Sequence, residues 1–275
     1  MWTLCCRRLC FGAIAALALA VGPLRAHAQE PVDVELILAV DVSLSMSPGE
    51  MEIQRRGYAA ALTHESVIGA IQSGLHGRIA LSYFEWAGDF SQRVVVPWTE
   101  IASAEDATRV AEMLSTHPPR SARRTSISGA IQFASDLFAE SGYRGARRIL
   151  DISGDGPNNQ GSPVLDARDA LIAEGITING LPLMTSDGMS STYDIGNLDR
   201  YYSDCVIGGP GSFVLPVNEW SQFPEAVRRK LVIELAGADL ENAHPQIILA
   251  QADPAYDCMI GERIWQNRSW QWQQP

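Results

Sequence analysis

The stretch that decides the fold is a buried strand followed by a short polar loop and the start of a helix. It reads Val34-Glu35-Leu36-Ile37-Leu38-Ala39-Val40-Asp41-Val42-Ser43-Leu44-Ser45-Met46-Ser47. The run before Asp41 is apolar apart from Glu35, as a parallel strand buried on both faces requires. In an extended loop, residues i, i+2 and i+4 project to the same side. The sequence therefore predicts that Asp41, Ser43 and Ser45 point together at the carboxyl end of a strand, where open α/β sheets place ligand sites.

Strand and helix patterns alternate along the rest of the chain. Strands are expected at residues 32–40, 78–86, 90–96, 148–153, 175–183 and 212–217, and helices at 47–72, 103–115, 125–141, 162–174 and 219–235. Ser47 and Glu50 form a capping box at the start of the first helix, which carries His64 on its core face. The short turn at Gly88 makes the second and third strands an antiparallel hairpin, and Pro97 is expected to end it.

This alternation predicts the fold class. It is an α/β fold with a doubly wound, mostly parallel sheet, helices on both faces and one antiparallel edge strand. We expect three parts: a signal peptide at 1–28, one domain at 29–236, and a tail at 237–275. The tail has little periodicity and several tryptophans. We interpret it as packing on the domain, the alternative being an aromatic surface for a partner.

The first residues have the features of an export signal. Arg7 and Arg8 precede an apolar run from Phe11 to Val21, and small residues flank His27. This arrangement predicts cleavage after Ala28 and a periplasmic or secreted protein with no stable membrane insertion. The alternative, an uncleaved anchor, is disfavoured because the apolar run is short for a bilayer span.

Cleavage would leave two cysteines, Cys205 and Cys258. An even pair in an exported chain favours a disulfide that ties the tail to the body, and two separate buried thiols are the alternative.

The chain carries a formal net charge of −11. The expected signal segment contains basic residues and no acidic ones, so its cleavage would make the net charge more negative. A strongly acidic protein of this kind is unsuited to nucleic acid or anionic lipid and suited to cations.

Two further loops are expected at the same sheet edge. Thr125 lies just before a helix and Asp155 follows a strand, so they would join Asp41, Ser43 and Ser45. The set contains two carboxylates and three hydroxyls, with no His or Cys. Oxygen ligands of this kind suit Mg²⁺, Mn²⁺ or Ca²⁺ and do not suit zinc or copper.

The same residues carry a family resemblance. Asp41-x-Ser43-x-Ser45 after an apolar strand, with Thr125 and Asp155 in that order, resembles the metal-ion-dependent adhesion site (MIDAS) of von Willebrand factor A domains, and the chain is most similar to secreted bacterial proteins of that kind. The resemblance covers roughly residues 32–236 and implies a doubly wound fold whose metal captures an acidic residue of a protein ligand. The chain departs from the family where many members have Thr-Asp-Gly and it has Gly154-Asp155-Gly156, and where glycines are replaced by Arg123 and Arg124.

An enzyme is the main alternative. An apolar strand ending in Asp41, with a later loop at Asp155, also resembles haloacid-dehalogenase-type phosphatases, in which Asp41 would be the nucleophile. That chemistry needs an acid/base carboxylate two residues on, where this chain has Ser43, and a lysine between the two loops. The one lysine, Lys230, follows both loops, and Asn159 replaces the last acidic ligand. A structural exported protein with a vestigial metal site is a third possibility.

Overall fold

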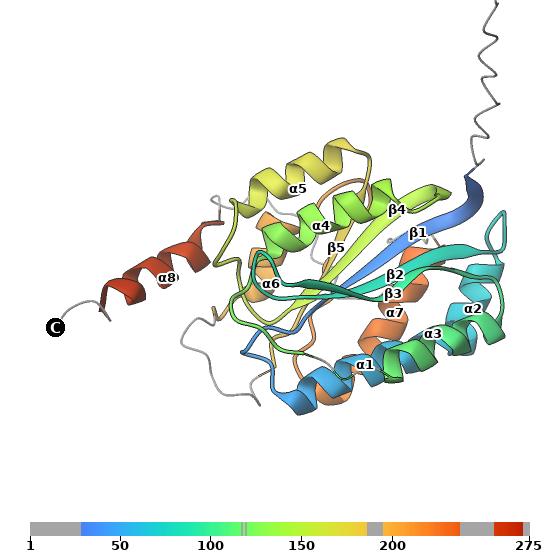
Figure 1. The fold of residues 1–275 in the computed structure, drawn as a ribbon, viewed down its shortest axis with the longest axis horizontal. Helices are drawn as coiled ribbons and strands as arrows, with labels where there is room; N and C mark the ends of the chain where they lie inside the picture. The colour runs from blue at the N-terminus through green and yellow to red at the C-terminus, as the bar shows by residue number, and fades with distance from the viewer. Residues whose placement is uncertain (1–28, 117, 119, 186–194, 237–255, 272–275) are drawn as a thin grey trace, which may run out of the picture.

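The computed structural model describes residues 29–116, 118, 120–185, 195–236 and 256–271. The expected signal peptide and most of the tail therefore lie outside the described residues. Within them, the chain forms one sheet with helices on both faces (Figure 1).

The sheet confirms the predicted fold class. Its order is β3-β2-β1-β4-β5, with bounds β1 (Glu30–Asp41), β2 (Ile79–Trp86), β3 (Gln92–Ile101), β4 (Tyr143–Gly154) and β5 (Thr177–Pro182). β1 pairs in parallel with β2 and β4, β4 pairs in parallel with β5, and β2 and β3 are antiparallel. The register sets Asp41 opposite Trp86 and Val40 opposite Ser153. The ends of the three central strands thus meet at one edge.

Side chains of β1 alternate between two cores. Leu36 and Leu38 face the layer formed by α1 (Pro48–Leu62), α2 (Glu65–Gln72), α3 (Ala104–Thr116) and α7 (Phe223–Ala236). Ile37 and Ala39 face the layer formed by α4 (Ile127–Ala139), α5 (Val164–Ala173) and α6 (Leu198–Tyr201). Figure 1 shows these layers on opposite sides of the sheet. Each fully buried Leu or Ile contributes about 1.5–3 kcal/mol of transfer free energy, which fixes β1 as the central strand.

The expected helix at 47–72 is two helices. The capping box at its start is present, with Ser47 and Glu50 bonding each other's backbone amides. Thr63 ends α1, and His64 adopts an extended backbone and caps α2 by accepting from the amide of Ser66. The prediction that His64 packs on a core face was therefore wrong, and its side chain is exposed. The break lets α2 bury its own apolar face at a new angle.

Two strand predictions were also wrong. Pro97 does not end β3, which continues to Ile101. β3 is an edge strand, where a missing backbone donor is tolerated, and the register shifts there so that Tyr83 pairs with Val96 and Leu81 with Thr99. The expected strand at 212–217 forms only isolated bridges, from Val214 to Gly180 of β5 and from Val217 to Leu183 just after it.

The tail, for which no element was predicted, contains α8 (Ile260–Gln271). Its described residues begin at Tyr256, and the disulfide between Cys205 and Cys258 joins them to the domain, with Cα atoms 5.5 Å apart. This pairing is the one that the sequence favoured.

The lone lysine is a buried structural residue. Lys230 of α7 lies between Asp151 of β4, with Nζ to Oδ1 at 2.8 Å, and Glu234 one turn further on. Asn179 of β5 donates to the same Glu234 carboxylate at 2.8 Å. Glu35 of β1 accepts from the amide of Gly145 at 2.6 Å. The polar cluster of Lys230, Asp151, Glu234 and Asn179 thus fixes α7 to the sheet.

Replacing the lysine tests this cluster. Lys230→Met should lower the free energy of unfolding by about 3–5 kcal/mol, because two buried carboxylates lose their counter-ion. Urea unfolding followed by circular dichroism measures the change. The control Arg229→Met removes an exposed cation of the same helix and should change stability by less than about 1 kcal/mol. Equal effects of the two variants would contradict the assignment.

The same cluster predicts a pH dependence. Burial raises the pKa of Glu234 from 4.5 to about 7, with the Lys230 charge opposing and the Asp151 charge adding to the rise. The folded chain then keeps a proton that the unfolded chain loses, so this group's stabilising contribution is present below pH 4.5 and is lost as the pH rises to about 7. Glu234→Gln cannot ionise. Its stability relative to the wild type should therefore increase across that window and level off above it, and a constant difference in urea unfolding would refute this.

Candidate metal centre

Asp41 ends the central strand with one oxygen atom left without a partner. Its side chain is fully buried. Oδ1 accepts a hydrogen bond from the amide of Ser43 at 2.7 Å, whereas Oδ2 has no hydrogen-bond partner within the structure described. Gln54 of α1 fixes the backbone by donating to the Asp41 carbonyl at 3.1 Å. A buried carboxylate oxygen without a partner is unfavourable, so this oxygen atom is a candidate ligand for a cation.

A chain of hydroxyls joins Asp41 to Asp155. The hydroxyl groups of Ser43 and Ser45 lie 2.9 Å apart, and Ser45 donates to Asp155 Oδ1 at 2.8 Å. Asp155 follows β4 directly and is half-buried. Four of the five residues expected at the site are therefore brought together by contacts across the sheet edge.

The two carboxylates repel each other. The pKa of Asp41 is raised well above its usual value, first by burial and second by the charge of Asp155. Ser43 and the backbone of Asp155 act in the opposite direction and lower this pKa. An arrangement that holds two acids close without a cation favours the approach of a positive ion.

Thr125, the fifth expected residue, joins the site through its backbone. Its amide donates to Asn159 Oδ1 at 3.0 Å, and its carbonyl accepts from the amide of Asn159 at 2.8 Å. Ala122 in the same loop bridges to Ser43. Arg124 has a φ of +77°, a region that favours glycine, which agrees with the glycine that the family resemblance implies before the threonine. The loop thus lies against both others.

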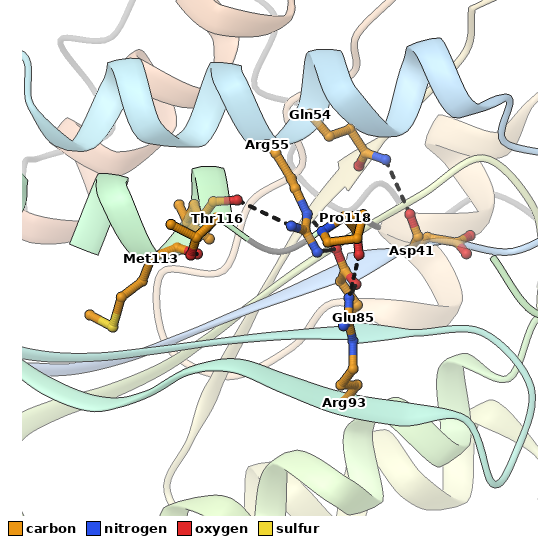
Figure 2. Close-up of polar contacts among 9 residues, drawn as sticks. Asp41, Gln54, Arg55, Glu85, Arg93, Met113, Thr116 and Pro118 are labelled. Carbon is orange, nitrogen blue, oxygen red and sulfur yellow. Dashed lines mark hydrogen bonds and ion pairs between the residues drawn. The ribbon is translucent and has the colours of Figure 1, made fainter. Parts of the chain in front are cut away.

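A second polar network holds the chain segment that leads into the Thr125 loop (Figure 2). Arg55 of α1 and Arg93 of β3 converge on the buried carboxylate of Glu85, with nitrogen-to-oxygen distances of 2.6 Å on each side. Arg55 also donates to the carbonyl of Leu114, and Arg93 to that of Pro118. In Figure 2, Gln54 reaches Asp41 from the same helix that carries Arg55. Helix α1 therefore positions both the loop that begins at Asp41 and the chain segment that leads to Thr125.

The tail helix contacts two of the three loops. Glu262 of α8 accepts from the side-chain amide of Asn158 at 2.7 Å, and the guanidinium of Arg124 lies 3.1 Å from the ring centre of Trp265. The disulfide at Cys258 anchors the start of this segment. The tail thus packs at the rim of the candidate site, which its weak sequence periodicity did not indicate.

Tyr202 was not found from the sequence. It is fully buried, its hydroxyl group has no hydrogen-bond partner within the structure described, and its pKa is raised by burial and then by the charges of Asp41 and Asp155. Gly154 gave the available signal, because the resemblance to von Willebrand factor A domains implies a threonine at this position. A small residue there leaves space for another side chain.

The donor set fits a hard divalent cation. Within the described residues, no three His, Cys, Asp or Glu side chains gather in a way that could hold a metal ion. An ion at this edge would therefore depend on two carboxylates together with neutral hydroxyls. Mg²⁺, Mn²⁺ and Ca²⁺ accept such oxygen ligands, and the partnerless Oδ2 of Asp41 supplies a free acceptor.

A family model matches most of the chain. The family is described as "Protein of unknown function (DUF1194)", and the match covers residues 31–239. It contains all five expected site residues and Cys205, and it ends before α8. A search of curated proteins finds no match.

Solved structures of von Willebrand factor A type share the fold. Proximal thread matrix protein 1 from the mussel byssus, in a form with a zinc-occupied MIDAS motif, has 18% identity and a TM-score of 0.54, covering 76% of this chain and 49% of its own. The pilus adhesin SpaC from Lactobacillus rhamnosus GG has 14% identity and a TM-score of 0.53, covering 75% and 31%. A von Willebrand factor type A protein from Catenulispora acidiphila has 13% identity and a TM-score of 0.52, covering 74% and 43%.

These likenesses show a von Willebrand factor A-like fold, and the chain spans half or less of the length of each of these proteins. As for membranes, none of the helices among the described residues combines the length and apolarity that a bilayer crossing needs.

The disulfide offers a test of how the tail is held. The Cys205→Ser/Cys258→Ser variant should be less stable by about 2–4 kcal/mol, because the bond closes a long loop in the unfolded chain. Thermal unfolding with and without a reductant measures this. The reductant should lower the melting temperature of the wild type toward that of the variant and leave the variant unchanged. A reductant-insensitive wild type would contradict a stabilising role.

Proposed function

We propose that this chain, which belongs to the DUF1194 family of proteins of unknown function, is an exported binding module that recognises a protein through a divalent cation. Asp41, Ser43, Ser45, Thr125 and Asp155 would hold the ion. One observation carries the proposal: the buried Oδ2 of Asp41 has no partner, next to a second carboxylate and two linked hydroxyls. A bound cation would offset the repulsion between the two carboxylates and would give Asp41 Oδ2 a partner.

The ion follows from the ligand chemistry. Oxygen-only ligands favour Mg²⁺, with Mn²⁺ or Ca²⁺ as substitutes. The zinc-occupied MIDAS of the mussel protein supports a divalent ion in this fold without fixing its identity here. Two directly bound carboxylates would neutralise a divalent ion. If Asp155 acts through water and the other direct ligands are neutral hydroxyls, the ion keeps a net positive charge. An open position on such an ion favours an anion, so the partner would present an Asp or Glu carboxylate.

The surroundings support a protein partner. Leu44, between the two site serines, is 55% exposed, and Phe90 at the tip of the β2–β3 hairpin is 96% exposed. Both follow the carboxyl ends of strands, and the loop that bridges to Ser43 through Ala122 carries the exposed basic residues Arg120 and Arg123. Apolar and basic groups around the metal complement an acidic side chain set among apolar neighbours.

A phosphatase is disfavoured by the positions of its required groups. Lys230, the only lysine, is fully buried between two carboxylates of a different cluster, so it cannot serve a phosphoryl group. Asn159 accepts from the Thr125 amide, and Ser43 stands where an acid would be needed. These contacts support a binding role without catalysis.

Export remains part of the proposal. Residues 1–28 have the pattern of a cleaved signal, and the disulfide between Cys205 and Cys258 suits an oxidising compartment. We therefore propose a periplasmic or secreted location, with cleavage after Ala28 and no stable insertion into a membrane.

Thermal unfolding of the mature protein tests the metal. Mg²⁺ at a hundred times its dissociation constant should stabilise the wild type by about 2.7 kcal/mol, a shift of several degrees in melting temperature. Asp41→Ala should abolish the shift, yet in EDTA it should be at least as stable as the wild type, because it removes a buried charge facing Asp155. The control Asp136→Ala, on exposed α4 surface, should keep the wild-type response. If Mg²⁺ does not shift the melting temperature of the intact wild type, the proposal is refuted.

A capture experiment separates a working module from a vestigial site. The wild type, immobilised in Mg²⁺, should retain a protein from the exported fraction and release it in EDTA. Asp41→Ala should retain none, and Asp136→Ala should behave as the wild type. Metal binding with no retained partner would favour the vestigial site.

A further inference from the structure

Tyr202 stands at an unusual place in the fold. It begins the π-helical segment Tyr202–Val206, which follows α6. Single π-helical turns are rare and occur frequently at functional sites. Cys205 in the same segment carries the disulfide to Cys258, so the turn is covalently tied to the tail.

The tyrosine hydroxyl fills space that Gly154 leaves open. A Cβ atom at position 154 would lie 2.8 Å from Tyr202 Oη and 2.9 Å from Asp41 Oδ2. Any larger residue there would displace one oxygen atom or both. The two oxygen atoms therefore lie close together on the same side of Gly154.

The hydroxyl group of Tyr202 and Asp41 Oδ2 have complementary hydrogen-bonding capacity. Tyr202 Oη and Asp41 Oδ2 are both buried, and neither has a hydrogen-bond partner within the structure described. The hydroxyl is a donor and the carboxylate oxygen is an acceptor with two lone pairs. Buried polar groups are rarely left unpaired, and a pair of such groups facing one space indicates a missing bridge or ion.

We propose that Tyr202 is a positioning residue of the metal centre. Its hydroxyl group donates, through one water molecule, to Asp41 Oδ2 and fixes the orientation of that carboxylate. The Ser43 amide holds Oδ1 from the other side, so the carboxylate plane is set before an ion arrives. Oδ2 keeps a second lone pair for the ion. This inference rests on the metal-binding part of the proposed function.

Mutation of the tyrosine tests the inference. Tyr202→Phe keeps the ring and removes only the hydroxyl, and it should raise the dissociation constant for Mg²⁺ about tenfold, as loss of a group that orients a metal ligand does. Isothermal titration calorimetry measures the constant. Mn²⁺ electron paramagnetic resonance gives a second readout, in which the spectrum of the bound ion should change. The melting temperature in EDTA should match that of the wild type.

The matched control is Tyr83→Phe. Tyr83 is equally buried and its hydroxyl also lacks a partner within the described structure, but it belongs to the core on the other face of the sheet. Its dissociation constant and Mn²⁺ spectrum should equal those of the wild type. Unchanged Mg²⁺ affinity in Tyr202→Phe, or an equal loss in both variants, would overturn the inference.

Gly154→Ala provides an independent arm that keeps the tyrosine. The added methyl group takes the shared space, so this variant should also lose Mg²⁺ affinity, by at least as much as Tyr202→Phe. Wild-type affinity in Gly154→Ala would show that the space is not used.

The outcomes separate the proposed metal centre from the proposed role of Tyr202. A wild type that binds no divalent ion refutes the metal centre itself, whereas a binding wild type with unaffected variants refutes only the role of Tyr202.

Discussion

The repulsion between two carboxylates at one sheet edge is the constraint on which the rest of this structure depends. Asp41 is buried at the end of the central strand, and Asp155, at the end of the neighbouring strand, raises its pKa further. Folding normally avoids this, because unpaired buried acids are costly. The chain nevertheless builds the whole carboxyl edge around the pair. Under the proposed function, a bound cation would offset this cost and stabilise the folded chain.

The loops are held by contacts that do not involve the ion. Gln54 fixes the backbone of Asp41, and Asn159 fixes Thr125 to the loop of Asp155. α8 adds contacts to Asn158 and Arg124 from the far end of the chain. Because these contacts form on folding, the oxygen atoms of the proposed site are organised in advance, which would strengthen ion binding by lowering its ordering cost. The same rigidity would present the open side of the ion to a partner in one fixed orientation.

The strand and its loop could be predicted because their signals are local. Continuous apolar residues before Asp41 require burial on both faces, and the capping box at Ser47 and Glu50 marks the helix start. The fold class followed from the alternation of such signals, and the Cys205–Cys258 pairing from the two cysteines that the expected cleavage leaves. The errors came from tertiary context. Pro97 is tolerated because β3 is an edge strand, and His64 leaves the core because the chain changes direction at Thr63. The contacts of Tyr202 with the site depend on a π-helical turn and on Gly154, which no local pattern reveals.

The most direct test of the central claim is anomalous diffraction from crystals of the mature protein grown with Mn²⁺. The account predicts one anomalous peak within coordination distance of Asp41, Ser43 and Ser45, with Thr125 and Asp155 bound directly or through water. A fully ordered site without a peak, in crystals that hold Mn²⁺ in their solvent, would contradict it. So would a peak confined to other carboxylates.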